Sequence, residues 1–167
     1  EDLYQDTGKR LFAPINGGFG VNASWRGLTL NADFAFVLGK WMMDNIEFFT
    51  YNQNFKDNNH DRALRNAWKK PGDITDVPRY GVENRFDTSQ LHNSSFLRLK
   101  NLSLSYDLPK SWMEATKVIR NVRLSATARN LLTFTKWKGA DPEYGSNISQ
   151  ATFPNTREFF LGIEVTF

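Results

Sequence analysis

The residue types that most often carry out chemistry are sparse in this sequence. Its two histidines, His60 and His92, are separated by a long stretch of chain, and neither has a second histidine at the i, i+4 spacing that places two metal ligands on one helix face. Cysteine is absent, which excludes a disulfide framework and thiolate metal sites. Asp141 and Glu143 could form a carboxylate pair, but Asp-Pro-Glu near glycines is more simply a turn. We therefore expect no catalytic residue, cofactor or metal, and no enzyme.

Aromatic side chains are the more informative group. They make up 14% of the chain, with 14 Phe, 5 Trp and 5 Tyr, which suits either interfacial girdles of a membrane barrel or surfaces that stack on sugar rings. Six of them lie in segments without strand periodicity, where they could contact a substrate or a partner, or could pack the loops against each other. These six are Trp41, Tyr51, Trp68, Tyr80, Trp137 and Tyr144.

The last segment of the chain, residues 158–167, has the strictest pattern. Every second residue is apolar and the residues between are mixed, which predicts a strand with one apolar face. Its length is close to the roughly 9 to 11 residues that a tilted strand needs to cross a bilayer. The closing aromatic residue resembles the assembly signal of bacterial outer-membrane barrels, although an edge strand of a soluble sandwich would alternate in the same way. The positions of this predicted assembly signal are Phe159, Leu161, Ile163, Val165 and Phe167.

Four further segments alternate with the same period of two, and we predict strands over residues 18–26, 28–39, 95–108 and 121–135. The first two form a hairpin through Arg26-Gly27. The phase of the third shifts by one residue near Lys100, which predicts either a bulge or emergence of the strand from the membrane. The inward positions of the hairpin are too polar for a sandwich core and suit a wet lumen. They are Asn22, Ser24, Arg26, Thr29, Asn31 and Asp33.

The connections between these strands alternate in length. Those at 26–27 and 109–121 are short, whereas 40–94 and 137–157 are long, and residues 1–17 form a further turn-rich loop. Bacterial outer-membrane barrels have short periplasmic turns and long external loops. A soluble sandwich has no reason to sort its loops by side, so this order favours the barrel.

The longest connection, 40–94, lacks a clear period over most of its length. A short helical stretch is predicted from about Arg62 to Lys70, where Pro71-Gly72 ends it. Connections this long are uncommon inside compact domains and usually serve a function or are disordered. We expect a large ordered surface loop.

Composition does not exclude a barrel, because alternation hides lipid-facing residues in a sequence of average polarity. The chain has 40% hydrophobic residues and a mean hydropathy of -0.52, and no apolar run is long enough for a membrane helix. The net charge is only +3 and the basic residues are dispersed, so no nucleic-acid partner is expected.

Five strands cannot close a barrel, because the smallest have about eight. We predict an all-β fold: an antiparallel transmembrane barrel segment, the C-terminal portion of a larger multi-pass barrel in the bacterial outer membrane.

Three ordered segments resemble one family. Ser95 to Pro109 resembles the S-F-L-R-L-K-N-(V/L)-x-L-x-Y-x-L-P segment of SusC/RagA-type TonB-dependent outer-membrane transporters. Ala128 to Trp137, with Asp141-Pro142-Glu143 after it, and the closing strand to Phe167 resemble further segments of that family. Leu64 to Arg79 resembles its W-x-x-P…T-x-x-P-R loop more loosely. The resemblance covers about residues 15 to 167.

The resemblance implies a barrel of about 22 strands with a plugged lumen, driven by TonB and capped by a SusD-like surface lipoprotein that captures the substrate. It implies import of oligosaccharides, with peptides as the alternative cargo, and wall contacts with outer-membrane lipid. The plug domain is absent from this sequence, so contact with TonB would be made through the missing N-terminal part. No energy-coupling residue can be assigned here.

Two other readings of the sequence stay open at this point. A different outer-membrane barrel, such as a surface protease or lipase, would need a carboxylate or Ser/His cluster at its outer rim, and no convincing one is present. A soluble carbohydrate-binding β-sandwich would behave as a soluble monomer. The barrel segment would instead aggregate without detergent and its missing strands.

Overall fold

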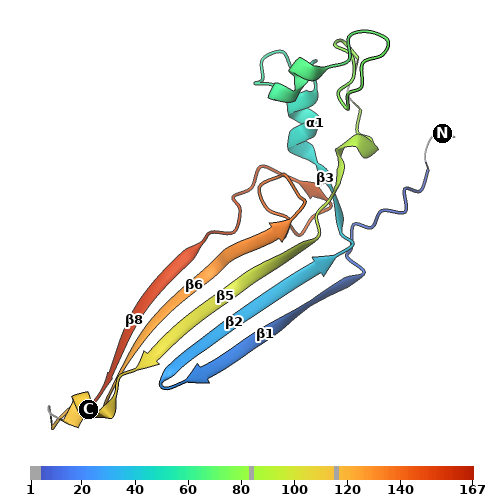
Figure 1. Cartoon of the computed structure of the whole chain (residues 1–167). Helices are drawn as coiled ribbons and strands as arrows, with labels where there is room; N and C mark the ends of the chain where they lie inside the picture. Colours follow the sequence, from blue (N-terminus) through green and yellow to red (C-terminus); the bar gives the residue numbers. More distant parts are fainter. Residues whose placement is uncertain (1–4, 83–84, 115–116) are drawn as a thin grey trace.

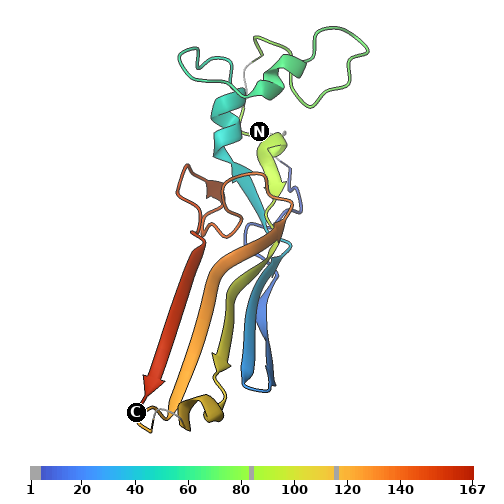
Figure 2. The same ribbon diagram turned by 60° about the vertical axis from the view of Figure 1, so that its left-hand side comes forward.

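The computed structural model describes residues 5–82, 85–114 and 117–167. Five long strands form one antiparallel sheet in the order β1-β2-β5-β6-β8, and Figures 1 and 2 show it as a single curved layer. The predicted antiparallel sheet of five strands is therefore confirmed. The strands are β1 (Ile15–Trp25), β2 (Leu28–Leu38), β5 (Phe96–Asp107), β6 (Asn121–Thr135) and β8 (Glu158–Thr166).

The connections are sorted between the two ends of the sheet. The β1–β2 turn, the segment with α2 (Lys110–Glu114) and the C-terminus lie at one end, and the chain between β2 and β5 rises from the other (Figures 1 and 2). The β1–β2 turn has two residues, Arg26 and Gly27, with φ of 46° and 86°. Positive φ at both positions matches the twist of a two-residue hairpin. A Cβ on Gly27 would also lie 2.9 Å from the carbonyl oxygen of Asp107.

A bulge interrupts β5 at the phase shift, which is one of the two explanations that the sequence left open. Phe34 pairs with Leu99 and the preceding residue, Asp33, pairs with Asn101, so Lys100 is the extra residue against β2. On the other side β6 carries its own extra residue, and Asn130 there has a φ of 51°. The phase shift in the sequence is therefore a real irregularity of the sheet.

One face of the sheet is apolar across all five strands. Phe19 of β1 stacks on Phe34 of β2 with ring centroids 4.8 Å apart, and the register continues such rows as far as β8. Leu161 of β8 has 89% of its surface exposed. Apolar residues in these rows include Trp25, Leu28, Leu30, Ala32, Leu102, Leu104, Tyr106, Leu124, Ala126, Ala128, Phe159, Ile163 and Val165. In the described ranges no second sheet covers this face, as a β-sandwich would require.

The opposite face carries a polar ladder. Asn101 donates to Asp33 across 3.2 Å, and Arg123 forms an ion pair with Asp107 at 2.8 Å. The side chains of Asn22 and Asn31 bond across the first hairpin. This is the face predicted to line a wet lumen.

The segment between β2 and β5 has more structure than the sequence predicts. It contains β3 (Trp41–Asp44), α1 (Asn45–Tyr51), the 3-10 turns η1 (Arg62–Asn66) and η2 (Thr88–Gln90), and β4 (Leu91–Asn93). The helix expected up to Lys70 is instead a short 3-10 turn, and α1 was not expected. Asp44 starts α1 by accepting from the backbone N–H groups of Ile46 and Glu47.

A second, smaller sheet joins this segment to the last loop. Its order is β4-β3-β7, with β7 at Ile148–Ser149. Three of the most buried apolar side chains belong to the elements that meet here: Met42 of β3, fully buried, Phe96 of β5 at 4% exposed and Trp137 of the last loop at 6%. None of the described helices is both long enough and apolar enough to cross a membrane.

Candidate functional site

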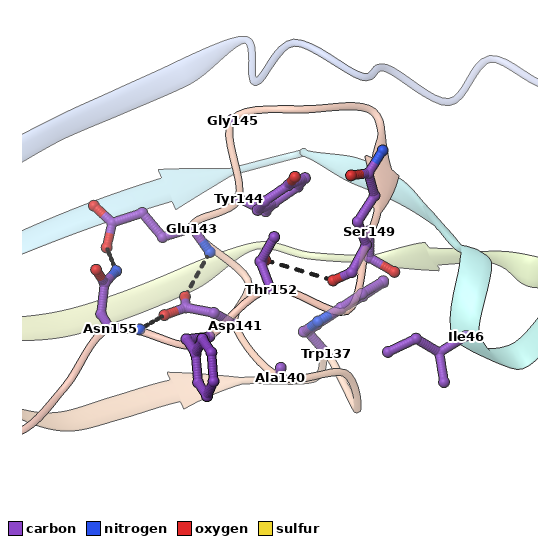
Figure 3. Close-up of a pocket in the computed structure, with 12 residues that line it drawn as sticks. Ile46, Trp137, Ala140, Asp141, Glu143, Tyr144, Gly145, Ser149, Thr152 and Asn155 are labelled. Carbon is purple, nitrogen blue, oxygen red and sulfur yellow. Dashed lines mark hydrogen bonds between the residues drawn. The ribbon is translucent and has the colours of Figure 1, made fainter.

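The connection from β6 to β8, residues 136–157, folds back at the end of the main sheet and encloses a small pocket (Figure 3). The pocket has a volume of about 210 Å³ and is lined by the rings of Trp137, Tyr144 and Phe153 and by polar residues that include Ser149 and Asn155. Its shape depends on how the loop is attached to the sheet.

Arg98 makes that attachment. This side chain of β5 is buried, with 4% of its surface exposed, and all its observed bonds are short. Nε donates to Thr133 Oγ1 of β6 at 2.9 Å, Nη1 donates to Glu143 Oε2 at 2.6 Å, and Nη2 donates to Asp141 Oδ1 at 2.6 Å. The guanidinium group therefore holds two carboxylates of the loop against two strands.

Two lysines complete the cluster. Lys100, the bulge residue, donates from Nζ to Glu143 Oε2 at 2.6 Å and so contacts the same loop residue as Arg98. Lys40 Nζ donates to the carbonyl oxygens of Pro142, at 3.4 Å, and Tyr144. Burial lowers the pKa of Lys40, and the charges of Glu143 and Asp141 offset part of that effect.

Asp141 is held in its charged form. Burial opposes its ionisation, but hydrogen bonds from Arg98 and from the backbone N–H groups of Glu143 and Asn155, with the charge of Arg98, outweigh burial and lower the pKa of the carboxyl group. The N–H of Asn155 donates to Oδ2 at 2.9 Å and that of Glu143 to Oδ1 at 2.9 Å (Figure 3). The side-chain amide of Asn155 reaches Glu143 at 3.2 Å.

This arrangement positions the loop and leaves the acids little capacity for other chemistry. Both carboxylates are bonded to cations and amides, and the described residues contain no cluster of potential metal ligands. The interpretation of Asp-Pro-Glu as a turn is incomplete, because the turn is also the acidic half of a buried ion cluster. The signal was present in the sequence: Arg98 and Lys100 stand out in an otherwise apolar stretch, and buried cations need anionic partners.

The histidines occupy separate positions. The ring of His92 in β4 is hydrogen-bonded to the carboxylate of Glu47 in α1 and lies 6.2 Å from the ring of Trp137. His60 Nε2 lies 3.0 Å from the carbonyl oxygen of Phe55.

The six loop aromatics do not form one surface. Trp137 and Tyr144 share the small pocket, Tyr51 and Trp68 line a second, larger groove, and Tyr80 is 73% exposed. Trp41 of β3 lies under Lys9, whose Nζ is 3.9 Å from the ring centroid. Contact of any of them with a substrate or partner stays a prediction, and so does the assembly role of the β8 residues.

Comparison with known proteins finds similarities to TonB-dependent receptors. The chain matches no protein-family model. It is 39% identical over 115 residues to TonB-dependent receptor P3 of Formosa agariphila, covering 61% of this chain and 11% of the relative. It is 36% identical over 77 residues to TonB-dependent receptor SusC of Bacteroides thetaiotaomicron, covering 46% of this chain and 8% of the relative. The chain thus spans a small part of the curated relatives it matches.

Two solved structures cover nearly the whole chain. A structure of the RagAB peptide transporter matches 95% of this chain at 48% identity, with a TM-score of 0.88. The RagAB peptide importer in its closed-closed state matches 99% at 47% identity, with a TM-score of 0.91. In both cases this chain covers 18% of the solved chain.

The single curved sheet, with one apolar and one polar face, defines a wall segment of a membrane β-barrel. Together with the similarities above, it bears out the resemblance to SusC/RagA-type TonB-dependent receptors that the sequence motifs predicted.

Proposed function

We propose that this chain forms wall strands and external loops of a SusC-like importer of the bacterial outer membrane, energised through TonB and paired with a SusD-like surface lipoprotein. The observation that carries the proposal is the exposed apolar face that runs across all five strands, opposite a polar face. Such a sheet is stable where lipid covers one side and a lumen wets the other.

In this proposal each end of the sheet has its own role. The α2 end faces the periplasm, and segments 40–94 and 136–157 face the outside, where the partner lipoprotein binds. The terminal strand β8, with its apolar row ending at Phe167, serves as the assembly signal. The Arg98 cluster holds the second external loop in the conformation that the partner and the cargo meet.

Two cargo classes fit the proposal. The resemblance to SusC-type systems favours oligosaccharides. The identity of 47 to 48% with RagAB segments over nearly the whole chain favours peptides, because these relatives are a peptide transporter and importer by name. Catalysis is not part of the proposal.

The first test is the intact mass of the native polypeptide that contains this sequence, with peptide sequencing upstream of Glu1. We expect a mass several times the 19.3 kDa of this chain, a plug region and a co-purifying lipoprotein. Uptake of labelled oligosaccharides and peptides is then compared in cells with and without TonB. A native chain of this size that stays monomeric without detergent would contradict the importer.

A further inference from the structure

The segment between β2 and β5 forms a groove that has no part in the site described above. The groove has a volume of about 1950 Å³ and is bordered by α1, η1, η2, β4 and the chain from Asn66 to Val82. Pockets for small molecules measure roughly 300 to 1,000 Å³. This groove therefore suits a chain-like ligand better than a single small molecule.

Positive side chains dominate the border of the groove. Six lysines and arginines line it, against four carboxylates. Within the ranges that the structure describes, five of these six side chains form no ion pair. These five are Arg65, Lys69, Lys70, Arg79 and Lys138.

The acids of the groove are mostly engaged elsewhere. Glu47 bonds to His92. Asp73 Oδ2 accepts from the backbone N–H groups of Lys69 and Lys70, at 3.0 and 3.1 Å, and Asp87 caps η2. These carboxylates do not pair with the lysine and arginine head groups, in contrast to the closed cluster around Arg98. Unpaired charges of one sign along a concave surface concentrate ligands of the opposite sign.

The backbone beside these charges favours a peptide over a sugar chain. β4 is the edge strand of the sheet β4-β3-β7, and His92 at its centre lines the groove together with Ser89. An edge strand offers backbone N–H and C=O groups to an extended peptide. Aromatic rings on which sugars stack are few among the lining residues, where Trp68 is the largest.

We propose that this groove binds acidic peptides in an extended conformation, with their Asp and Glu carboxylates against Arg65, Lys69 and Lys70. The inference rests on the proposed importer in its peptide form and adds a charge preference for the cargo. The groove would select acidic segments before they reach the lumen.

The test measures binding to the full native polypeptide in detergent micelles. The probes are a fluorescent glutamate-rich peptide and the same peptide with every Glu replaced by Gln. The triple variant Arg65→Gln, Lys69→Gln, Lys70→Gln removes three exposed charges whose side chains make no hydrogen bond in the described structure, so the fold should persist. The matched control is Lys56→Gln, Arg62→Gln, which removes exposed charges of the same segment that do not line the groove.

We expect the triple variant to bind the acidic peptide at least about tenfold more weakly. A loss of this size corresponds to the combined effect of three exposed charge contacts, each of modest strength. The control should bind like the unchanged protein, the Gln peptide should bind weakly to all, and added salt should remove the preference. Equal affinity of the triple variant and the control would overturn the proposal. Competition by an acidic oligosaccharide as strong as that by the acidic peptide would overturn the peptide assignment.

The same variants separate this inference from the importer itself. If TonB-dependent uptake persists while the triple variant binds normally, the groove proposal fails and the importer stands. If the native protein shows no uptake of any cargo but its binding of acidic peptide depends on the three cations, the groove stands and the importer fails.

Discussion

Arg98 Nη2 donates to Asp141 Oδ1 across 2.6 Å, which joins residues 43 positions apart in the sequence. The two lie in segments that the family resemblance singled out separately, the strand beginning at Ser95 and the loop containing Asp-Pro-Glu. Their contact shows that these motifs are the two halves of one attachment between wall and external loop.

Replacing Arg98 by Leu should release the loop. The substitution leaves Asp141 and Glu143 without their buried partner, and breaking a buried ion pair from one side costs on the order of 3 kcal/mol. Hydrogen exchange of the amides in residues 136–157 measures the free energy of loop opening. The control is Arg129→Gln, which removes an exposed pair with Glu158 at 3.6 Å and should cost less than about 1 kcal/mol. Equal protection of the loop in both variants would show that Arg98 does not hold it.

The attachment should also weaken in acid. Because the folded pKa of Asp141 is lowered, its contribution to loop stability is complete above the unfolded value of about 3.9 and is lost as pH falls through the folded value. Limited proteolysis of residues 136–157 over this range should show increasing cleavage toward low pH. Asp141→Asn should remove most of this pH dependence, and a variant that kept the full dependence would place the titrating group elsewhere.

The faces of the sheet predict where charge is tolerated. Leu161→Arg or Phe34→Arg should lower the free energy of unfolding in lipid, and so destabilise the protein, by roughly 2 to 4 kcal/mol if these positions face the middle of the bilayer. Ser103→Arg and Thr166→Arg, on the polar face, should have little effect. Urea titrations of the native polypeptide refolded in vesicles compare the four, and indifference to all of them would make the face assignment wrong.

Gly139 should matter for the pocket of the second loop. A Cβ there would lie 2.7 Å from Cε2 of Trp137, so Gly139→Ala must displace the buried indole. We expect faster proteolysis of the loop and greater quenching of tryptophan fluorescence by iodide. Gly145→Ala is the matched control, because a Cβ at that position meets nothing within 4 Å. The same result for both variants would exclude close packing of Trp137 as the cause.

Sequence patterns predicted the main sheet well because strand periodicity is local. The alternation of residues 158–167 and the phase shift near Lys100 are visible without knowledge of the fold, and the structure has β8 and the bulge at those places. The family resemblance depended on similarly local motifs around Ser95 and Asp141.

The external segments were less predictable because their structure depends on distant contacts. β3 forms by pairing with β4 and β7, from opposite ends of the long segment and from the second loop. α1 is too short to show a clear period and depends on the Asp44 cap. The ion cluster joins Lys40, Arg98 and Glu143, and no spacing rule connects residues that far apart.

As the inserted residue of the bulge, Lys100 determines which face of β5 the residues on either side of it occupy. Leu97 and Leu99 before it and Leu102 and Leu104 after it share the apolar face only because one residue is inserted between the two pairs. Deleting Lys100 would put the two halves of β5 out of step, since a shift of one residue exchanges the faces of a strand. One half would then turn its polar side toward lipid, and Arg98 would be separated from its loop partners although its own side chain is unchanged.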